Sequence, residues 1–273
     1  MAVSASLPVS VVILTKNEEL AIEACVSSVS GFDEVFVVDS GSTDRTVELA
    51  EKLGATVISF DWNGQYPKKK QWALDNCPIS NDWVLMLDAD EVVTPELTRE
   101  IARLDLTTNI TAYDVMLDYV FLGRRLEHGH KVSKRILLRR DRNVFPVVDD
   151  LGATNMWEVE GHYQPVTDGE VGRLKSSLLH EDREPLFHYF ERHNRYSDWE
   201  AHLASSERKQ VAEARSKQGQ VFDRVPFKPL AFFVYSYLAR RGFRDGAAGF
   251  HYAVAHAFYF WQIGVKRSEL KRA

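Results

Sequence analysis

The chain of 273 residues has little cysteine, no long hydrophobic run and no excess of positive charge. Its two cysteines, Cys25 and Cys77, stand in neither a metal-binding nor a redox spacing, so we expect reduced thiols. No stretch approaches the roughly 18–20 apolar residues that cross a bilayer, and we expect no signal peptide. The net charge of −5 argues against a nucleic-acid partner. These absences favour a cytoplasmic protein.

A glycine-rich phosphate loop is also missing. No Gly-x-Gly-x-x-Gly follows the first predicted strand, at 9–14, which disfavours a dinucleotide-binding fold of the Rossmann type. A nucleotidyltransferase would also need a glycine-rich, basic loop at this point. The turn carries Thr15-Lys16-Asn17-Glu18 instead, and we expect these side chains to contact a ligand.

The first hundred residues alternate short apolar runs with helix signals. The runs at 9–14, 35–38, 55–60 and 83–87 are typical of buried parallel strands. This rhythm predicts an α/β fold with a mostly parallel central sheet and helices on both faces. Asn17 is expected to cap the first helix.

The rhythm changes after Leu106. In chain order we expect strands of a mixed or antiparallel extension at 113–121 and 134–139, a loop-rich stretch at 141–175, one long helix or a helical pair at 184–217, and two short helices from about 228 that part at 242–246.

Polar side chains follow three of the predicted strands, at the point where each strand ends. They are Thr15-Lys16-Asn17-Glu18, then Asp39, then Asp88-Ala89-Asp90. The carboxyl ends of parallel strands form the ligand-binding edge of an open α/β sheet. Two carboxylates one residue apart can share a divalent cation and leave room for a diphosphate. The alternative is a turn with solvated acids.

Two aspartates, Asp39 and Asp44, follow the second strand. Asp39 can accept a hydrogen bond from a base N–H or a ribose hydroxyl, with local capping as its alternative. Local capping is the favoured role of Asp44.

Three segments carry a resemblance to a known family. VVILTKNEE, VFVVDSGSTDRT and DWVLMLDADE resemble the nucleotide-sugar-binding half of the inverting family 2 glycosyltransferases, which have the GT-A fold. FLGRRLEHGHKVSKRILLRR, WEVEG and LLHEDREPLFHYFERHNRYS more weakly resemble the subgroup that extends lipopolysaccharide core or other bacterial surface glycans. The resemblance implies a GT-A domain at 1–225, with a nucleotide-sugar half (1–105) and an acceptor half (106–225). A basic, aromatic helical segment follows at 226–273.

The resemblance also implies roles for single residues. Thr15, Asn17 and Glu18 match positions that pack around the nucleoside, and Asp39 matches the carboxylate that reads the base (usually uracil). In the motif Asp88-Ala89-Asp90, the resemblance implies that Asp88 lies near the ribose and that Asp90 binds the Mg²⁺ or Mn²⁺ that bridges the diphosphate. Lys70 matches a basic position before the fourth strand, although Gln71 replaces the usual Asn. For Lys68 and Lys69 a solvated helix face is the alternative.

The catalytic base is expected in the second half of the chain. Glu158 resembles a family position often written His-Glu, but Trp157 replaces the histidine here. Glu160 is the second candidate for the base, and an ion pair with a nearby arginine is the alternative role for Glu158.

Other side chains of the second half are candidates for ligand contacts. His180 can join Asp88 and Asp90 around the metal, or it is a structural histidine. Arg135, Arg139 and Arg140 can bind a diphosphate or an anionic acceptor, or they serve only to keep a strand edge soluble.

The C-terminal segment is basic and aromatic. From Phe227 to the end there are eight Lys/Arg against two Asp/Glu, interleaved with Phe, Tyr and Trp. This pattern suits helices lying at 228–267 in a membrane interface next to anionic lipid. The alternative is a helical hairpin that packs in the core or in a dimer.

The sequence therefore predicts a metal-dependent inverting glycosyltransferase of GT-A fold. The expected donor is a UDP-sugar, and the expected acceptor is a glycan or glycolipid at the inner face of a bacterial membrane. The alternatives are a nucleotidyltransferase and a non-catalytic nucleotide-sugar-binding or scaffolding protein.

Overall fold

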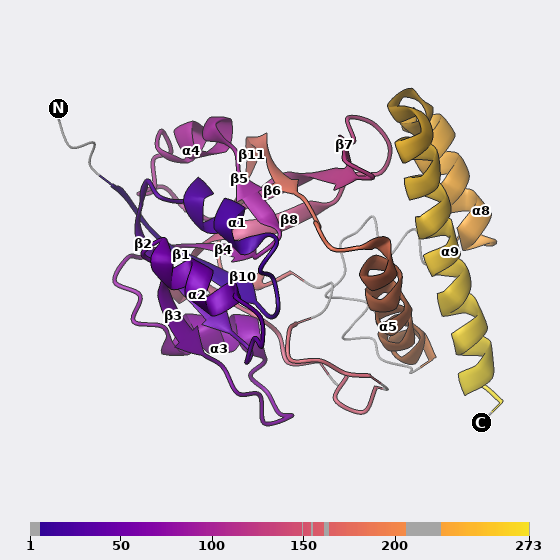
Figure 1. The fold of residues 1–273 in the computed structure, drawn as a ribbon, viewed down its shortest axis with the longest axis horizontal. Helices are drawn as coiled ribbons and strands as arrows, with labels where there is room; N and C mark the ends of the chain where they lie inside the picture. The colour runs from indigo at the N-terminus through magenta and orange to yellow at the C-terminus, as the bar shows by residue number, and fades with distance from the viewer. Residues whose placement is uncertain (1–5, 149, 154, 161–163, 206–224, 273) are drawn as a thin grey trace. The chain divides into compact units, whose positions relative to one another are not determined.

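The structure is a computed structural model, which describes residues 6–148, 150–153, 155–160, 164–205 and 225–272. The chain divides into two units, each built from separate stretches of sequence (Figure 1). The first unit consists of Met1–Asp118, Val132–Phe145 and Gln164–Arg183, and the second of Tyr119–Lys131, Pro146–Tyr163 and Glu184–Ala273. The predicted domain boundary at residue 225 stays a prediction.

Four parallel strands form one half of the sheet in the first unit. They lie in the order β3 (Thr56–Ser59), β2 (Phe32–Asp39), β1 (Leu7–Thr15) and β4 (Trp83–Asp88). From Val9 onward every residue of β1 is buried, because both faces of this strand are covered. This half confirms the parallel α/β core that the sequence predicts.

Further strands extend the sheet beyond β4. They are β8 (Ser133–Arg139), β6 (Ile110–Phe121), β11 (Glu170–His180) and β5 (Glu91–Val93), in that order, with β7 (Arg124–Arg125) paired to β6 and a separate ribbon of β9 (Asn143–Val144) and β10 (Val166–Thr167). Strand β8 is antiparallel to both β4 and β6, and β11 is antiparallel to β5. The sheet as a whole is therefore mixed. The long strand β11 also takes up part of the stretch expected to be loop-rich.

The sheet curls back on itself. Strand β5 begins three residues after β4 ends, yet it pairs with β11 at the far end of the strand order. Both conditions hold only if the far edge of the sheet returns to the carboxyl end of β4. The curl therefore brings β11 next to the Asp88-Ala89-Asp90 motif.

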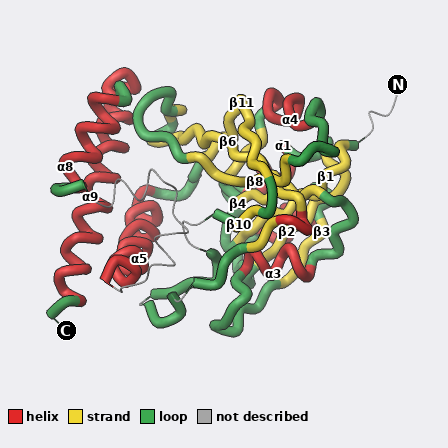
Figure 2. The backbone as a smooth tube through the Cα atoms, turned by 180° about the vertical axis from the view of Figure 1, so that it is seen from behind, coloured by secondary structure: helices red, strands yellow, loops and turns green. Residues whose placement is uncertain are grey.

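Short helices surround these strands (Figure 2). They are α1 (Ile22–Ser28), α2 (Thr46–Lys52), α3 (Lys69–Asn76) and α4 (Pro95–Ile101). Thr94 caps α4, since its hydroxyl accepts a hydrogen bond from the Leu97 amide at 3.2 Å. The expectation that Asn17 caps α1 is wrong, because the helix begins at Ile22 and the Asn17 side chain bonds to Thr43 instead.

The second unit is mainly helical. Helix α5 (Leu186–Ser205) packs against α9 (Gly246–Leu270), which also packs against α8 (Lys228–Phe233). Helix α8 continues as a π-helical turn, Val234–Ala239, and a 3₁₀ turn, Gly242–Asp245, leads into α9. A cluster of buried side chains holds β6 and the β7 loop to α9, and its members are Phe121, Leu126, Ala248 and Tyr252.

Helix α9 differs from the short helix that the sequence predicts, because it runs for 25 residues. The break at 242–246 is confirmed. Part of the helical stretch predicted at 184–217 lies outside the described residues. Among the helices of the described ranges, none combines the length and the apolarity that crossing a bilayer requires.

Two glycines allow the close approach between α9 and the turn before it. A Cβ atom on Gly249 would lie 2.1 Å from the Gly242 carbonyl oxygen, and one on Gly242 would lie 2.8 Å from the Ser236 carbonyl oxygen. Any side chain at Gly249 therefore forces backbone to move. This contact fixes α8 and α9 as the two arms of a tight hairpin.

Candidate functional site

The strand register brings three predicted site residues to one edge of the first unit. Thr15 pairs with Asp39 across β1 and β2, and Leu14 pairs with Asp88 across β1 and β4. At the returning edge of the sheet, His180 on β11 pairs with Glu91 on β5. The curl thus adds His180 to the carboxyl-end edge that the parallel strands already share.

The loops after β1 and β2 are bonded to each other. Asn17, which has a φ of +55°, accepts a hydrogen bond from the Thr43 amide at 2.8 Å and donates its own amide to the Ser42 hydroxyl at 2.8 Å. The Glu18 amide donates to the Thr46 hydroxyl at 2.8 Å. These bonds place the predicted nucleoside residues of the first loop beside those of the second.

Both aspartates of the second loop make local hydrogen bonds. Asp39 is buried and accepts from the Ser42 amide at 2.9 Å and from the Ser42 hydroxyl. Asp44 accepts from the Thr46 amide at 3.0 Å and from its hydroxyl, and these bonds lower the pKa of Asp44 against the opposing effect of burial. Local capping is therefore confirmed for Asp44. Asp39 also makes local bonds, and its contact with a base stays a prediction.

Two hydroxyl groups at this edge are buried without a hydrogen-bond partner. They are Thr15 Oγ1 and Ser40 Oγ, and no described residue donates to them or accepts from them. Buried polar atoms of this kind are rare in folded proteins, because each costs on the order of 1–3 kcal/mol when it is left unpaired. A polar ligand at the edge would supply the missing bonds.

Lys68 and Lys69 lie in the interior of the first unit, with only 0% and 1% of their surface exposed. The Lys69 ammonium group donates to the Thr15 carbonyl oxygen at 2.6 Å. The Lys68 ammonium group lies 5.4 Å from the centroid of the Tyr66 ring. The solvated helix face considered for these two lysines is therefore wrong, and Lys69 supports the end of β1.

Lys70 stands on the first turn of α3. Its ammonium group lies 5.8 Å from the centroid of the Phe145 ring. Lys70 also contributes to lowering the pKa of Asp88, so its positive charge acts on the motif. Its predicted role, close to a bound diphosphate, agrees with this position but stays a prediction.

A partly buried cluster of charges surrounds Asp88. The Lys134 ammonium group lies 2.7 Å from Asp88 Oδ2 and 2.7 Å from both carboxylate oxygens of Glu91. Burial opposes ionisation of Asp88, but Lys134 and Lys70 hold its pKa well below the usual range. Burial is the main cause of the raised pKa of Glu91, and the two carboxylates raise the pKa of Lys134.

Asp90 points to a different neighbour. Its Oδ1 atom lies 3.5 Å from Nδ1 of His180, and the Glu181 amide donates to its backbone oxygen at 2.8 Å. Asp90 Oδ1 is buried and has no hydrogen-bond partner among the described residues. A carboxylate oxygen in this state fits a cation, since carboxylate and imidazole both coordinate Mn²⁺.

The candidate metal ligands do not form a closed cage. Within the described ranges, no three side chains of His, Cys, Asp or Glu lie together in a way that could hold a metal ion. Asp90 and His180 face each other, whereas the Asp88 carboxylate contacts Lys134. The residues present therefore fit a cation that takes its remaining ligands from a bound diphosphate, as Mg²⁺ sites often do.

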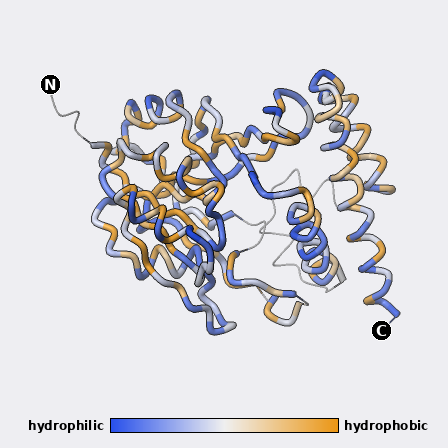
Figure 3. The backbone as a smooth tube through the Cα atoms, viewed as in Figure 1, coloured by the Kyte–Doolittle hydropathy of each residue, from blue (hydrophilic) through white to orange (hydrophobic). Residues whose placement is uncertain are grey.

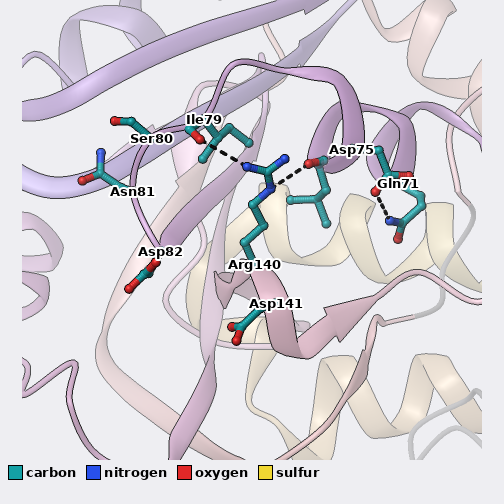
Figure 4. Close-up of a pocket in the computed structure, with 9 residues that line it drawn as sticks. Gln71, Asp75, Ile79, Ser80, Asn81, Asp82, Arg140 and Asp141 are labelled. Atoms are coloured by element: carbon teal, nitrogen blue, oxygen red, sulfur yellow. Dashed lines mark hydrogen bonds between the residues drawn. The ribbon is translucent and has the colours of Figure 1, made fainter.

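Arg139 and Arg140 lie at the other end of the sheet. Strand β8 runs antiparallel to β4, so Arg139 pairs with Trp83, the first residue of β4, while Lys134 lies near its last. Arg140 lines a pocket of about 400 Å³ and donates to the Leu74 and Ile79 carbonyl oxygens at 2.9 and 3.2 Å (Figure 4). A diphosphate role for Arg139 and Arg140 is thus wrong.

Arg135 also has structural partners. Its Nε atom donates to Asp114 Oδ1 at 2.8 Å, and its Nη1 atom donates to the Thr167 hydroxyl at 2.9 Å. These bonds join β8 to β6 and to the short ribbon.

Glu158 and Glu160 belong to the second unit. The neighbouring Trp157 ring packs against Tyr196 and Trp199 of α5, with centroid distances of 5.0 and 6.0 Å. Glu158 is partly exposed, whereas Glu160 is buried. No described residue forms an ion pair with Glu158, so the alternative role for it is not observed, and its role as a base stays a prediction.

Sequence reasoning gave no role to Glu91 or Lys134 and did not predict that Lys69 is buried. Glu91 follows the motif directly, and its adjacency was the available signal. The sequence gave no signal that Lys134 and Lys69 lie in the interior, because a lysine in a strand or helix is usually solvated. The curl of the sheet and the packing of α3 bring these lysines inside.

The chain is similar to known glycosyltransferases. Residues 10–157 match the model of the family described as Glycosyl transferase family 2. The chain is 27% identical over 266 residues to the lipopolysaccharide core biosynthesis glycosyltransferase LpsC of Rhizobium meliloti, covering 95% of this chain and 92% of that protein. It is 29% identical over 256 residues to an uncharacterised glycosyltransferase of Rickettsia typhi, covering 92% and 83%.

Part of the chain is also similar to a protein of solved structure. Glucosyl-3-phosphoglycerate synthase from Mycobacterium tuberculosis, crystallised with Mn²⁺, UDP and glucosyl-3-phosphoglycerate, is 28% identical, with 42% of this chain and 44% of that one covered. The TM-score is 0.32, so we draw no structural argument from it. The family match covers more than half of this chain and includes the strands of the parallel core. The chain is therefore a glycosyltransferase of family 2, and its curled, mixed sheet with flanking helices is the GT-A fold.

Proposed function

We propose that this glycosyltransferase moves a sugar from a UDP-sugar to a bacterial surface glycan or glycolipid, with inversion at the anomeric carbon and with Mg²⁺ or Mn²⁺. The observation that carries the proposal is the state of Asp90. Its Oδ1 atom is buried, lies 3.5 Å from His180 Nδ1 and has no hydrogen-bond partner among the described residues. Asp90 and His180 would hold the cation, and Asp88 would remain near the ribose.

The bound cation would stabilise the negative charge that develops on the departing diphosphate. Lys70 is placed to add to that stabilisation, since its charge already acts on Asp88. The buried hydroxyl of Thr15 and the carboxylate of Asp39 would bind the nucleoside, and uracil is the base that the family resemblance favours. These roles use the edge where Thr15 and Asp39 pair in register.

The transfer is a single displacement. The acceptor hydroxyl oxygen forms a bond to the anomeric carbon while the bond from that carbon to the diphosphate oxygen breaks, and its electron pair leaves with UDP. The proton of the hydroxyl passes to the carboxylate of Glu158, with Glu160 as the alternative base. One carboxylate suffices, in contrast to glycoside hydrolysis, which uses two.

The relatives support the proposed acceptor class. LpsC, which aligns over nearly the whole chain, is named for lipopolysaccharide core biosynthesis. We infer an acceptor of the same kind, a surface glycan or its lipid-linked precursor, at the inner face of the cytoplasmic membrane.

A thermal-shift screen tests the donor and the cation. A panel of nucleotide sugars is added with and without Mn²⁺, and a UDP-sugar with Mn²⁺ is expected to raise the melting temperature most. A ligand present at a hundred times its Kd adds about 2.7 kcal/mol to the free energy of unfolding. Stabilisation by other nucleotides alone, or equal stabilisation of Asp90→Asn, would contradict the proposal.

Turnover separates this proposal from a non-catalytic binding protein. Incubation of the stabilising donor with the protein and Mn²⁺ is expected to release UDP slowly to water, even without acceptor. A protein that binds the donor tightly but releases no UDP, with or without bacterial glycolipid extract, would favour the scaffold alternative.

A further inference from the structure

The C-terminal hairpin, residues 227–272, exposes large apolar side chains on both of its arms. On α9 they recur at intervals of three or four residues, which places them in one stripe along the helix. We call the following set the apolar face: Phe227, Leu230, Val234, Tyr235 and Leu238 on the first arm, and Phe250, Val254, Phe258, Trp261 and Val265 on α9. Figure 3 shows hydrophobic residues along both arms.

The two halves of the apolar face adjoin. The Phe250 ring, which is 41% exposed, lies 6.0 Å from the Phe233 ring and 5.6 Å from the Tyr237 ring, measured between centroids. Arms α8 and α9 also pack directly against each other. Phe233 and Tyr237 therefore link the stripe on α9 to the first arm, and an exposed apolar surface of this kind marks an interaction site.

Positive charge gathers at the turn of the hairpin. Arg240, Arg241 and Arg244 are exposed there, and Arg124 of the β7 loop joins them by donating to the Arg244 carbonyl oxygen at 3.4 Å. We call these four the arginine cap. Glu127 is an exposed acidic neighbour, and the four arginines outnumber it.

The nearby Asp245 is also acidic, but the four arginines outnumber Asp245 and Glu127 together. Asp245 is 2% exposed, and it accepts hydrogen bonds from the Glu127 and His128 amides at 3.3 and 2.9 Å. Its carboxylate is used to hold the β7 loop against the hairpin.

We propose that the apolar face and the arginine cap together dock this protein on an anionic phospholipid surface. The helices would lie in the interface with their apolar side chains among the upper acyl chains, while the arginines contact the headgroups. Docking would bring the enzyme to the lipid-linked acceptor of the proposed function, but it does not depend on transfer.

The charge pattern disfavours a second copy of the chain as the occupant. In a two-fold dimer with parallel hairpins, one arginine cap would meet the other. With antiparallel hairpins, the cap would meet the C-terminal turn, where Arg267, Lys271 and Arg272 outnumber Glu269. Either arrangement places like charges together, whereas an anionic lipid surface complements both ends.

Vesicle sedimentation of the full chain tests the proposal. Wild-type protein is expected to bind vesicles of phosphatidylcholine with phosphatidylglycerol, to bind pure phosphatidylcholine weakly, and to release as salt is raised. Arg241→Gln with Arg244→Gln should weaken binding by about fivefold for each arginine removed. Phe258→Ser with Trp261→Ser should weaken it by about tenfold for each side chain.

Matched controls come from exposed residues elsewhere. Phe187→Ser removes an aromatic that is 70% exposed on α5, and Arg45→Gln with Arg99→Gln removes two exposed arginines of the first unit. Both controls should bind vesicles as the wild type does. Equal loss in a control and its matching variant would overturn the proposal.

A second measurement does not require a disruptive change. Brominated lipids are expected to quench the fluorescence of wild-type protein, and Trp261→Phe should remove most of that quenching while binding persists. Absence of quenching, or binding to neutral and anionic vesicles alike, overturns the proposal. The proposal is also overturned if the wild-type protein is a dimer in solution and the Phe258→Ser, Trp261→Ser variant is a monomer. That result would identify a second copy of the chain as the occupant of the apolar face.

The donor site gives an independent readout on the same samples. Stabilisation by UDP with Mn²⁺ should be the same in every hairpin variant. A protein that binds UDP with Mn²⁺ but ignores vesicles refutes only the docking surface, and one that binds vesicles but no nucleotide refutes only the proposed function.

Discussion

The Lys134 ammonium group lies 2.7 Å from Asp88 Oδ2, so the first aspartate of the motif already has a cation that the protein itself supplies. The second aspartate, Asp90, faces His180 and has a buried oxygen without a hydrogen-bond partner among the described residues. The two carboxylates therefore have different environments although one residue separates them. This difference argues that Asp88 is positioned by the chain and that Asp90 is left for the metal.

Lys134→Met should destabilise the first unit strongly. The change leaves Asp88 and the fully buried Glu91 without their shared cation, and removing one partner of a buried ion pair costs about 3–5 kcal/mol. Urea unfolding measures the loss. Adding Glu91→Gln to Lys134→Met should recover part of the lost stability. The control Lys175→Met, at an exposed position of β11, should lower the free energy of unfolding only slightly. An equal cost for Lys134→Met and Lys175→Met would mean that the cluster contributes nothing to stability.

Asp90→Asn and Asp88→Asn should affect Mn²⁺ differently. With UDP present, Asp90→Asn is expected to weaken Mn²⁺ binding on the order of a hundredfold or more, because it removes the proposed ligand. Asp88→Asn should weaken it much less, since its carboxylate contacts Lys134. Titration followed by electron paramagnetic resonance measures free Mn²⁺ directly. If the two variants lose Mn²⁺ affinity equally, the division of roles between the aspartates is wrong.

Glu158→Gln should abolish transfer without weakening the donor. A general base contributes roughly 10²–10⁴-fold to the rate, so kcat should fall by that factor while the Kd for the UDP-sugar stays near the wild-type value. Glu160→Gln is the matched comparison, two residues away in the same segment. Wild-type turnover in Glu158→Gln together with loss in Glu160→Gln would transfer the role to the buried Glu160.

The parallel half of the site followed from the sequence because local rules determine it. Buried runs that end at Thr15, Asp39 and Asp88 predict parallel strands, and parallel strands place their carboxyl ends at one edge. The register of these strands confirms that edge.

The half of the site beyond β4 did not follow in the same way. Lys134 reaches Asp88 because β8 pairs antiparallel with β4, and His180 reaches Asp90 because the sheet curls until β11 meets β5. Both depend on pairing between strands far apart in the sequence, which no local pattern specifies. The diphosphate role left open for Arg139 and Arg140 fails for the same reason, since the direction of β8 carries them away from the motif.

The second unit should lose stability as the pH falls below about 6.5. Burial, with smaller contributions from His193 and His130, lowers the pKa of His256 to about 3, and burial with Arg240 nearby lowers that of His130 to about 4. An unfolded histidine has a pKa near 6.5, so between that value and the folded pKa the unfolded chain binds more protons. The free energy of unfolding therefore decreases with falling pH, by up to about 1.4 kcal/mol per pH unit for each histidine.

His256→Phe isolates this contribution. The ring stacks on Phe232 at 5.5 Å, so phenylalanine should fill the same space and lose the contacts of Nδ1 with the Tyr252 carbonyl oxygen at 3.2 Å and with the Tyr189 hydroxyl at 3.5 Å. Urea unfolding at pH 7, 6 and 5 should show a shallower pH dependence in this variant than in the wild type. His251→Gln, at an exposed position of α9, serves as the control and should keep the wild-type slope. If His256→Phe keeps that slope as well, protonation of His256 does not limit the stability of the helical unit in acid.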